Sequence, residues 1–293
     1  MFATLLGGLP RPPLSPDAEP EALLDACLAL QAEHGLEPLT DGGWALRPAE
    51  PAASWRLTAD RAGGLVKAVV IGPRSSQRSV QAVRAEIRAL ADAGCRWIEV
   101  HEPFAITLAD RDADERARFA DDHRRLTDGL GSDLHLSLAI TGGNADAAGI
   151  DTILAGAYAS LALDLIAGPD NWRLAVAAPT EIGIVCGAVS GRAGSDDGPE
   201  ILLWAAQYAA SSAGRGMDRV GLATSGPLGD LAWDVAATKV RRLGEAARLA
   251  VASPEEQRAA LDPRALDIRS AALGRAAPPP ARSTASRRGR PRR

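Results

Sequence analysis

The stretch at residues 95–103, which reads CRWIEVHEP, indicates how this chain folds. Its aromatic and β-branched residues favour a short buried strand, and Pro103 ends the strand because proline has no backbone N–H to donate. Helical patterns precede this strand at 79–93 and follow it at 112–130. A strand between two helices indicates a parallel α/β architecture, in which functional groups gather at the carboxyl ends of strands.

Seven further segments have a similar strand-like character, and helix-like stretches separate most of them. The eight candidate strands lie at 3–6, 37–41, 66–71, 97–100, 133–138, 160–165, 182–186 and 219–223. Eight strand units over about 250 residues are typical of a (β/α)8 barrel, and a doubly wound open sheet is the alternative. We therefore expect an α/β fold with a single (β/α)8 barrel at 1–252, whose last helix spans 230–251. The glycine-rich and proline-rich connections at 42–65 and 187–199 are expected to be long loops.

The charge is distributed unevenly along the chain. Its 293 residues carry a net charge of −4, but residues 276–293 hold six arginines and no acidic residue. The preceding residues therefore carry a net charge of −10, which argues against an enzyme acting on nucleic acid. We expect a short helical extension at 253–275 and a disordered tail at 276–293. The tail is interpreted either as a solvated extension or as a weak contact for RNA or another polyanion.

The cysteines and the apolar runs indicate a compartment. Cys27, Cys95 and Cys186 are widely spaced and form no CxxC pair, so we expect reduced thiols rather than disulfides or a cysteine-rich zinc site. The first residues lack the basic flank of a signal peptide. No apolar run reaches the ~18 residues of a transmembrane helix. These features predict a cytoplasmic protein without membrane partners.

Four segments match, in order, the motifs of one enzyme family. They are TLLGGLPR at 4–11, GLEPLTDGG at 35–43, IGP at 71–73 and AGCRWIEVHEP at 93–103. Over residues 3–250, the chain resembles the catalytic barrel of cobalamin-independent methionine synthase, whose fold is shared with uroporphyrinogen decarboxylase. The resemblance implies a (β/α)8 barrel and methyl transfer from methyltetrahydrofolate to a thiol, with methyltetrahydrofolate as the substrate that donates the methyl group.

The zinc ligands of that family are not retained here. The family holds zinc with His, Cys, Glu and Cys, and the matching positions carry the residues Ser137, Ala139, Asp164 and Ser225. Alanine cannot ligate a metal, and serine is a poor zinc ligand compared with imidazole or thiolate. Zinc is therefore not expected at these positions. Polar contacts to the family's amino-acid substrate also differ, because the matching residues are Gly8, Gly43 and His101.

The polar residues at predicted strand ends are the candidate site. We expect His101, Glu102 and Asp41 to be catalytic, because imidazole and carboxylate groups serve as general acids and bases. The expected substrate contacts are Arg11, Arg74, Asn144, Asp164 and Ser225. Each residue also has a structural interpretation. Glu102 and the aspartates fit hydrogen-bond networks, caps and turns, and the arginines fit surface salt bridges.

Three functions remain open from the sequence. The first is a diverged, zinc-independent enzyme acting on a small polar molecule. The second is a folate-dependent methyltransferase that keeps zinc through substitute ligands such as His101, His135 and Asp164. The third is a non-catalytic barrel that binds a small molecule or regulates another process.

Overall fold

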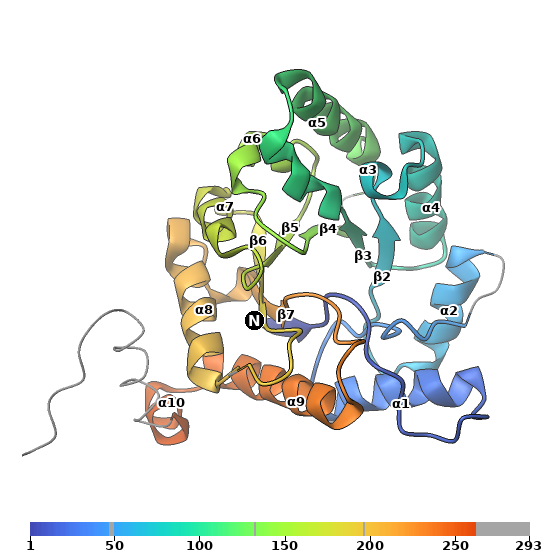
Figure 1. The fold of residues 1–293 in the computed structure, drawn as a ribbon, viewed down its shortest axis with the longest axis vertical. Helices are drawn as coiled ribbons and strands as arrows, with labels where there is room; N and C mark the ends of the chain where they lie inside the picture. The colour runs from blue at the N-terminus through green and yellow to red at the C-terminus, as the bar shows by residue number, and fades with distance from the viewer. Residues whose placement is uncertain (47–49, 132, 196, 262–293) are drawn as a thin grey trace, which may run out of the picture.

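Seven parallel strands form one curled sheet with the helices on its outer side (Figure 1). The computed structural model describes residues 1–46, 50–131, 133–195 and 197–261. The strand order is β1-β7-β6-β5-β4-β3-β2, and every neighbouring pair is parallel. The strands are β1 (Phe2–Thr4), β2 (Ala68–Ile71), β3 (Trp97–His101), β4 (His135–Ile140), β5 (Ser160–Asp164), β6 (Gly183–Val189) and β7 (Val220–Thr224). The parallel α/β prediction is confirmed.

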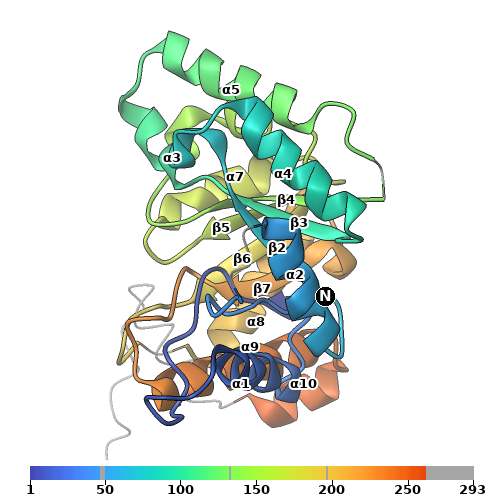
Figure 2. The ribbon, with the colours of Figure 1, turned by 90° about the vertical axis from the view of Figure 1, so that its right-hand side faces the viewer.

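Helices follow most of the strands and bury one face against the sheet. They are α1 (Pro20–Glu33), α2 (Pro51–Arg61), α3 (Pro73–Ser76), α4 (Val80–Asp92), α5 (Ala113–Thr127), α6 (Ile150–Ile153), α7 (Trp172–Ala177), α8 (Pro199–Ser211), α9 (Trp233–Ala250) and α10 (Pro254–Ala260). Figure 2 shows α4 and α5 together at one end of the molecule, with α1, α9 and α10 at the other. Among the described residues, no helix is both long and apolar enough to cross a bilayer.

The predicted helices before and after β3 begin at their capping residues. Ser79 accepts the Ala82 N–H at 3.2 Å before α4, and Asp112 accepts the Glu115 N–H at 2.8 Å before α5. The apolar spacing of α4 reaches the core as predicted, and its buried residues are Val80, Val83, Ile87 and Leu90. The segment at 42–65 is not only a loop, because it contains α2.

The predicted strand at 37–41 is wrong. In its place, the structure has two single bridges, one between Ala3 and Glu37 and one between Leu39 and Val66. The first bridge joins this segment to β1, and the second joins it to Val66, which lies two residues before β2. The sheet therefore contains seven regular strands, and the eighth position is occupied by a segment with bridging contacts only.

Side chains supplement the backbone hydrogen bonds at this position, where Pro38 has no N–H to donate. Thr4 Oγ1 donates to the Pro38 carbonyl at 2.7 Å. The buried Gln31 amide donates to the Thr40 carbonyl at 2.8 Å and accepts the Thr40 N–H at 2.9 Å. The segment is thus held between β1 and β2 by a few backbone hydrogen bonds, including Glu37 N–H to Ala3 and Leu39 N–H to Leu65, and by two polar side chains.

The inner face of the sheet has two different parts. One is a small apolar cluster of Leu6, Ala139, Ala162, Val185 and Ala223, which is separate from the main core between sheet and helices. The other is polar and lies on β2, β3 and β4. Aromatic rings close its amino-terminal end, where Trp97 contacts Phe2 and His135 with ring centroids 5.1 and 3.8 Å away.

The two predictions for the C-terminal region have different outcomes. α10 lies inside the predicted extension at 253–275, but the predicted tail at 276–293 lies outside the described residues. The chain division into a barrel, an extension and a tail stays a prediction.

Replacing Gln31 with methionine tests how the eighth position is fixed. Q31M keeps the side-chain volume but leaves the buried Thr40 N–H and carbonyl without their partner. An unsatisfied buried polar group costs about 1–3 kcal/mol, so we expect the free energy of unfolding to fall by at least about 2 kcal/mol in urea titrations. The control Q81M changes an exposed glutamine on α4 and should stay within about 0.5 kcal/mol of the unmodified chain. Equal stabilities of Q31M and Q81M would contradict this role.

Candidate functional site

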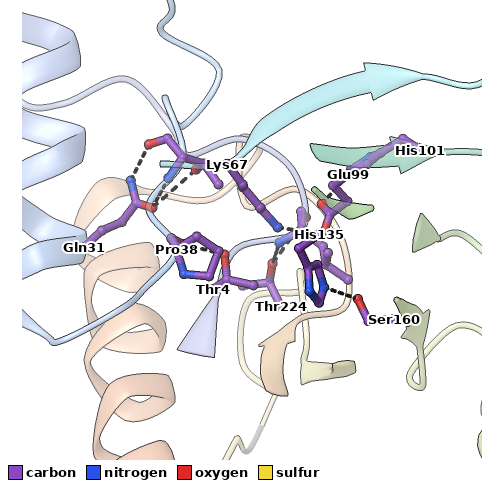
Figure 3. A network of polar contacts seen from close by, with 11 residues as sticks. Thr4, Gln31, Pro38, Lys67, Glu99, His101, His135, Ser160 and Thr224 are labelled. Atoms are coloured by element: carbon purple, nitrogen blue, oxygen red, sulfur yellow. Dashed lines mark hydrogen bonds and ion pairs between the residues drawn. The ribbon is translucent and has the colours of Figure 1, made fainter. Parts of the chain in front are cut away.

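A buried ion pair lies on the inner face of the sheet, between β3 and the residue preceding β2. Lys67 Nζ lies 2.7 Å from Glu99 Oε2, and their side chains are 0% and 1% exposed (Figure 3). Neither residue is among the site residues expected from the sequence. Their signal was an ionisable side chain inside a short apolar strand pattern, VKAVV for Lys67 and WIEV for Glu99.

The pair is held as an ammonium and a carboxylate. Burial alone would raise the pKa of Glu99, but the Lys67 ammonium and the His101 hydrogen bond outweigh burial and lower this pKa to about 2. Burial lowers the pKa of Lys67, and the Glu99 carboxylate opposes that shift. Glu99 is therefore ionised at neutral pH, which requires the cation beside it.

His101 ends β3 and contacts the other oxygen of Glu99. Its Nε2 lies 2.7 Å from Glu99 Oε1, and its side chain is 13% exposed. An ionised carboxylate only accepts hydrogen bonds, so Nε2 carries a proton and Nδ1 is the basic nitrogen of the neutral ring. The arrangement orients an imidazole at a strand end, where it can take up or release a proton.

The sheet is open to solvent on this side. Val69 and Ile71 lie on the same face of β2 as Lys67, and they are 43% and 45% exposed. They pair in register with Glu99 and His101 of β3. His101 lies next to these exposed apolar side chains and is itself partly exposed, while Glu99 stays buried.

His135 lies nearer the amino-terminal end of the inner face. Its Nε2 lies 2.8 Å from Ser160 Oγ, and its ring packs against Trp97. Burial lowers the pKa of His135 to about 4, with Glu99 opposing and Lys67 adding to the shift. The ring is neutral at pH 7, and its contacts make it a packing residue of the closed end.

Glu102 faces away from His101, because successive residues of an extended chain point to opposite sides. Its side chain is fully buried and accepts the Arg74 N–H at 3.1 Å, the Ser75 N–H at 2.7 Å and the Ser75 hydroxyl. A Cβ on Gly72 would lie 2.2 Å from Glu102 Oε2, so glycine is required at that position. Glu102 fixes the turn into α3 and does not join the polar inner face.

The other predicted residues do not converge on His101 in this structure. Arg74 pairs with Glu115 and Asp122 on the helical side. Arg11 donates to the carbonyls of Ser15 and Pro16 at 3.0 Å each.

The remaining polar candidates order loops at the strand ends. Asp41 Oδ1 accepts the Gly43 N–H at 2.7 Å in a local turn. Asn144 exchanges hydrogen bonds with Asp170, donating to its carboxylate and accepting its N–H. Roles for these residues in substrate binding stay predictions.

The positions that match the family's zinc ligands carry no thiolate or imidazole. The Asp164 carboxylate accepts three backbone N–H groups, from Gly142, Ile166 and Ala167, at 2.8–3.0 Å. Ser137 Oγ is buried without a hydrogen-bond partner, and Ala139 packs in the apolar cluster. Ser225 lies beside β6, where its N–H donates to the Val189 carbonyl. Across the described ranges, no group of three or more His, Cys, Asp or Glu residues could hold a metal ion.

The thiol in the middle of β6 is not an activated nucleophile. Cys186 is fully buried, and burial raises its pKa to about 12, with a small opposing effect of Arg215. A reactive cysteine needs a lowered pKa and access to its substrate.

Comparison with solved structures identifies proteins with a similar fold. The chain matches a B12-independent methionine synthase from Shewanella sp. W3-18-1 with a TM-score of 0.68, at 13% identity over 88% of this chain and 99% of that chain. The curled parallel α/β fold of this chain is thus similar to the fold of that protein. A Listeria monocytogenes structure with a similar name matches at 0.66, with 12% identity over 86% and 98% of the two chains. A methyltransferase from Methanosarcina mazei matches at 0.53, with 14% identity over 83% and 93%. No protein-family model and no curated protein sequence matches the chain. The resemblance to methionine synthase is thus confirmed for the fold.

Substitutions of the ion pair should show a strong coupling between its members. Lys67→Met leaves the Glu99 carboxylate buried without its cation, and we expect a loss of about 3–5 kcal/mol in the free energy of unfolding. The double variant K67M/E99Q removes both charges and should recover most of that loss. The exposed pair of Arg241 and Glu245 provides the control, and R241M should change stability by less than about 1 kcal/mol. A double variant no more stable than K67M would contradict the interpretation.

The lowered pKa of His135 predicts an acid-dependent loss of stability. Between pH 6.5, where the unfolded residue titrates, and about pH 4, the unfolded chain binds more protons at this site than the folded chain. Stability should therefore fall as pH falls through this window, by up to about 3 kcal/mol from this residue. H135Q should flatten that part of the curve in urea titrations at a series of pH values, whereas H34N should leave it unchanged. A curve of H135Q parallel to that of the unmodified chain would refute the assignment.

Proposed function

We propose that this protein is a diverged, zinc-independent enzyme that acts on a small polar molecule at the β2–β3 side of a methionine-synthase-like (β/α)8 barrel. The observation that carries the proposal is the contact between His101 and the ionised Glu99 at the open side of the inner face. We further propose that residues 1–252 form the barrel domain and that the protein works in the cytoplasm without cobalamin.

In this proposal, His101 is the acid–base residue. Its Nδ1 accepts a proton from the substrate, and the resulting imidazolium is stabilised by the Glu99 carboxylate 2.7 Å from Nε2. Lys67 keeps Glu99 ionised and fixed, so it is a positioning residue rather than a catalytic one. The exposed apolar surface of Val69 and Ile71 provides the adjacent wall for the substrate.

The residues present do not fit the zinc of the related enzymes. Zinc sites that activate a thiol are built from thiolate, imidazole and carboxylate donors, and the four matching positions offer one carboxylate that already accepts three N–H groups. The substitute set of His101, His135 and Asp164 is also unfavourable. His135 packs against Trp97 near the amino-terminal end, while Asp164 orders a loop at the carboxyl end. Transfer of a methyl group to a zinc-bound thiol is therefore not the reaction we propose.

A ligand screen on the full-length protein tests the proposal. Candidate ligands include small carboxylates and amines, homocysteine, methyltetrahydrofolate and porphyrin precursors, and binding is detected as a rise in Tm. A ligand at about 100 times its Kd stabilises the folded state by about 2.7 kcal/mol. We expect a compound that raises the Tm of the unmodified protein but not of H101N. The control variant is H34N, which changes the residue that follows α1. The ligand should raise the Tm of H34N as much as that of the unmodified protein.

Three outcomes would overturn this assignment. A ligand that stabilises H101N as strongly as the unmodified protein would place the site elsewhere. Purified protein that retains one equivalent of zinc after dialysis would favour the metal-dependent methyltransferase instead. If no compound raises the Tm and none is turned over, the non-catalytic barrel is the better description.

A further inference from the structure

An exposed aromatic patch lies on the outer surface of α7 and α8, away from the inner face. We define the aromatic patch as Trp172, Trp204 and Tyr208, whose ring centroids lie 5.0–5.5 Å apart. Trp204 and Tyr208 are stacked at an interplanar angle of 12°, and Trp172 meets both edge-on. Trp204 is 48% exposed and Tyr208 is 39% exposed. Trp204 and Tyr208 face the solvent, and Trp172 is partly buried against the core and supports both rings edge-on.

The patch belongs to a helix that is apolar on two sides. The sheet-facing side of α8 is buried through Leu202, Leu203, Ala205, Ala206 and Ala209. Its outer side carries Ile201, Trp204 and Tyr208, which follow one another at helical spacing. A helix with a second, exposed apolar face is typical of a surface that binds another segment.

We propose that the proline-rich segment at residues 276–282, AAPPPAR, docks on the aromatic patch of the same chain. Three consecutive prolines favour the polyproline II conformation. A segment in this conformation loses little conformational entropy on binding, and surfaces lined with aromatic side chains recognise it. Proline rings stack on the exposed faces of Trp204 and Tyr208, and the guanidinium of Arg282 adds a cation–π contact. The occupant is a segment of this chain because the place where the described chain ends is close to the patch.

The geometry of α10 brings the tail to this surface. Pro199, the first residue of α8, and Ala260, the last residue of α10, line the same surface hollow. Trp204 and Tyr208 lie five and nine residues further along α8, or about 7.5 and 13.5 Å at 1.5 Å per residue. The 16 residues from 262 to 277 span up to about 55 Å when extended, so the tether reaches the patch with length to spare.

Covalent linkage makes even a weak contact effective. A short tether holds its segment at an effective concentration of the order of millimolar, so a contact that would be unoccupied between free molecules is occupied within one chain. The tail would then cover the apolar surface of α8.

A fluorophore on the tail tests the contact in the full-length protein. The three native cysteines are buried, so a thiol-specific bimane group attaches to Cys at position 281 in the variant Ala281→Cys. Tryptophan quenches bimane emission at contact distance. We expect emission several-fold lower in A281C than in A281C/W204L. The control A281C/W233L changes a tryptophan on α9 and should stay quenched.

A second variant separates docking from any effect of W204L on folding. Replacing the three prolines with glycine in A281C leaves the helices untouched and should restore emission as W204L does. Equal emission from A281C, A281C/W204L and the triple-glycine variant would overturn the proposal. Quenching that disappears on serial dilution would also overturn it, because it would show that the occupant is a second copy.

Discussion

The ion pair between Lys67 and Glu99 is the constraint on which the inner face depends. Two charges without solvent exposure are stable only together, because each would lose several kcal/mol of hydration if left alone. The pair links the residue before β2 to the middle of β3, and it leaves one oxygen of Glu99 for His101. The position and ionic partner of the partly buried His101 imidazole therefore follow from a contact that no solvent reaches.

The same inner face shows how the sheet is held where strand pairing is weakest. Between β1 and β2, the chain makes two single bridges with few backbone hydrogen bonds, and the side chains of Gln31 and Thr4 add further ones. On the far side of β1, Thr224 Oγ1 accepts the Leu6 N–H at 2.9 Å and donates to its carbonyl at 3.2 Å. Polar side chains on both sides of β1 thus join the first and last strands of the chain to the rest of the sheet.

Periodicity in the sequence predicts the regular elements well and the side-chain partners poorly. The apolar spacing and capping serine of α4 predict its buried face, and the aromatic and β-branched residues of 97–100 predict β3. The same periodicity gives a wrong prediction at 37–41. The local composition suits a strand, but Pro38 has no backbone N–H for regular strand pairing. His101 and Glu102 were expected at one site because they are adjacent in sequence. In an extended chain, however, successive side chains point to opposite faces of the sheet. Lys67 and Glu99 are far apart in sequence, and only the register of β2 with β3 shows that they meet.

The division of the inner face explains where a reaction can occur in this chain. At the strands that match the family's zinc positions, Ala139 packs with Leu6, Ala162, Val185 and Ala223 in a solvent-free cluster. The cluster fills space that an ion and its ligands would need, and its apolar atoms would leave a charge there without compensation. On β2 and β3, by contrast, charged groups are already paired and the neighbouring surface is exposed. A charged group is therefore better accommodated beside His101 than in the apolar cluster, which is the physical reason for proposing the reaction on the β2–β3 side.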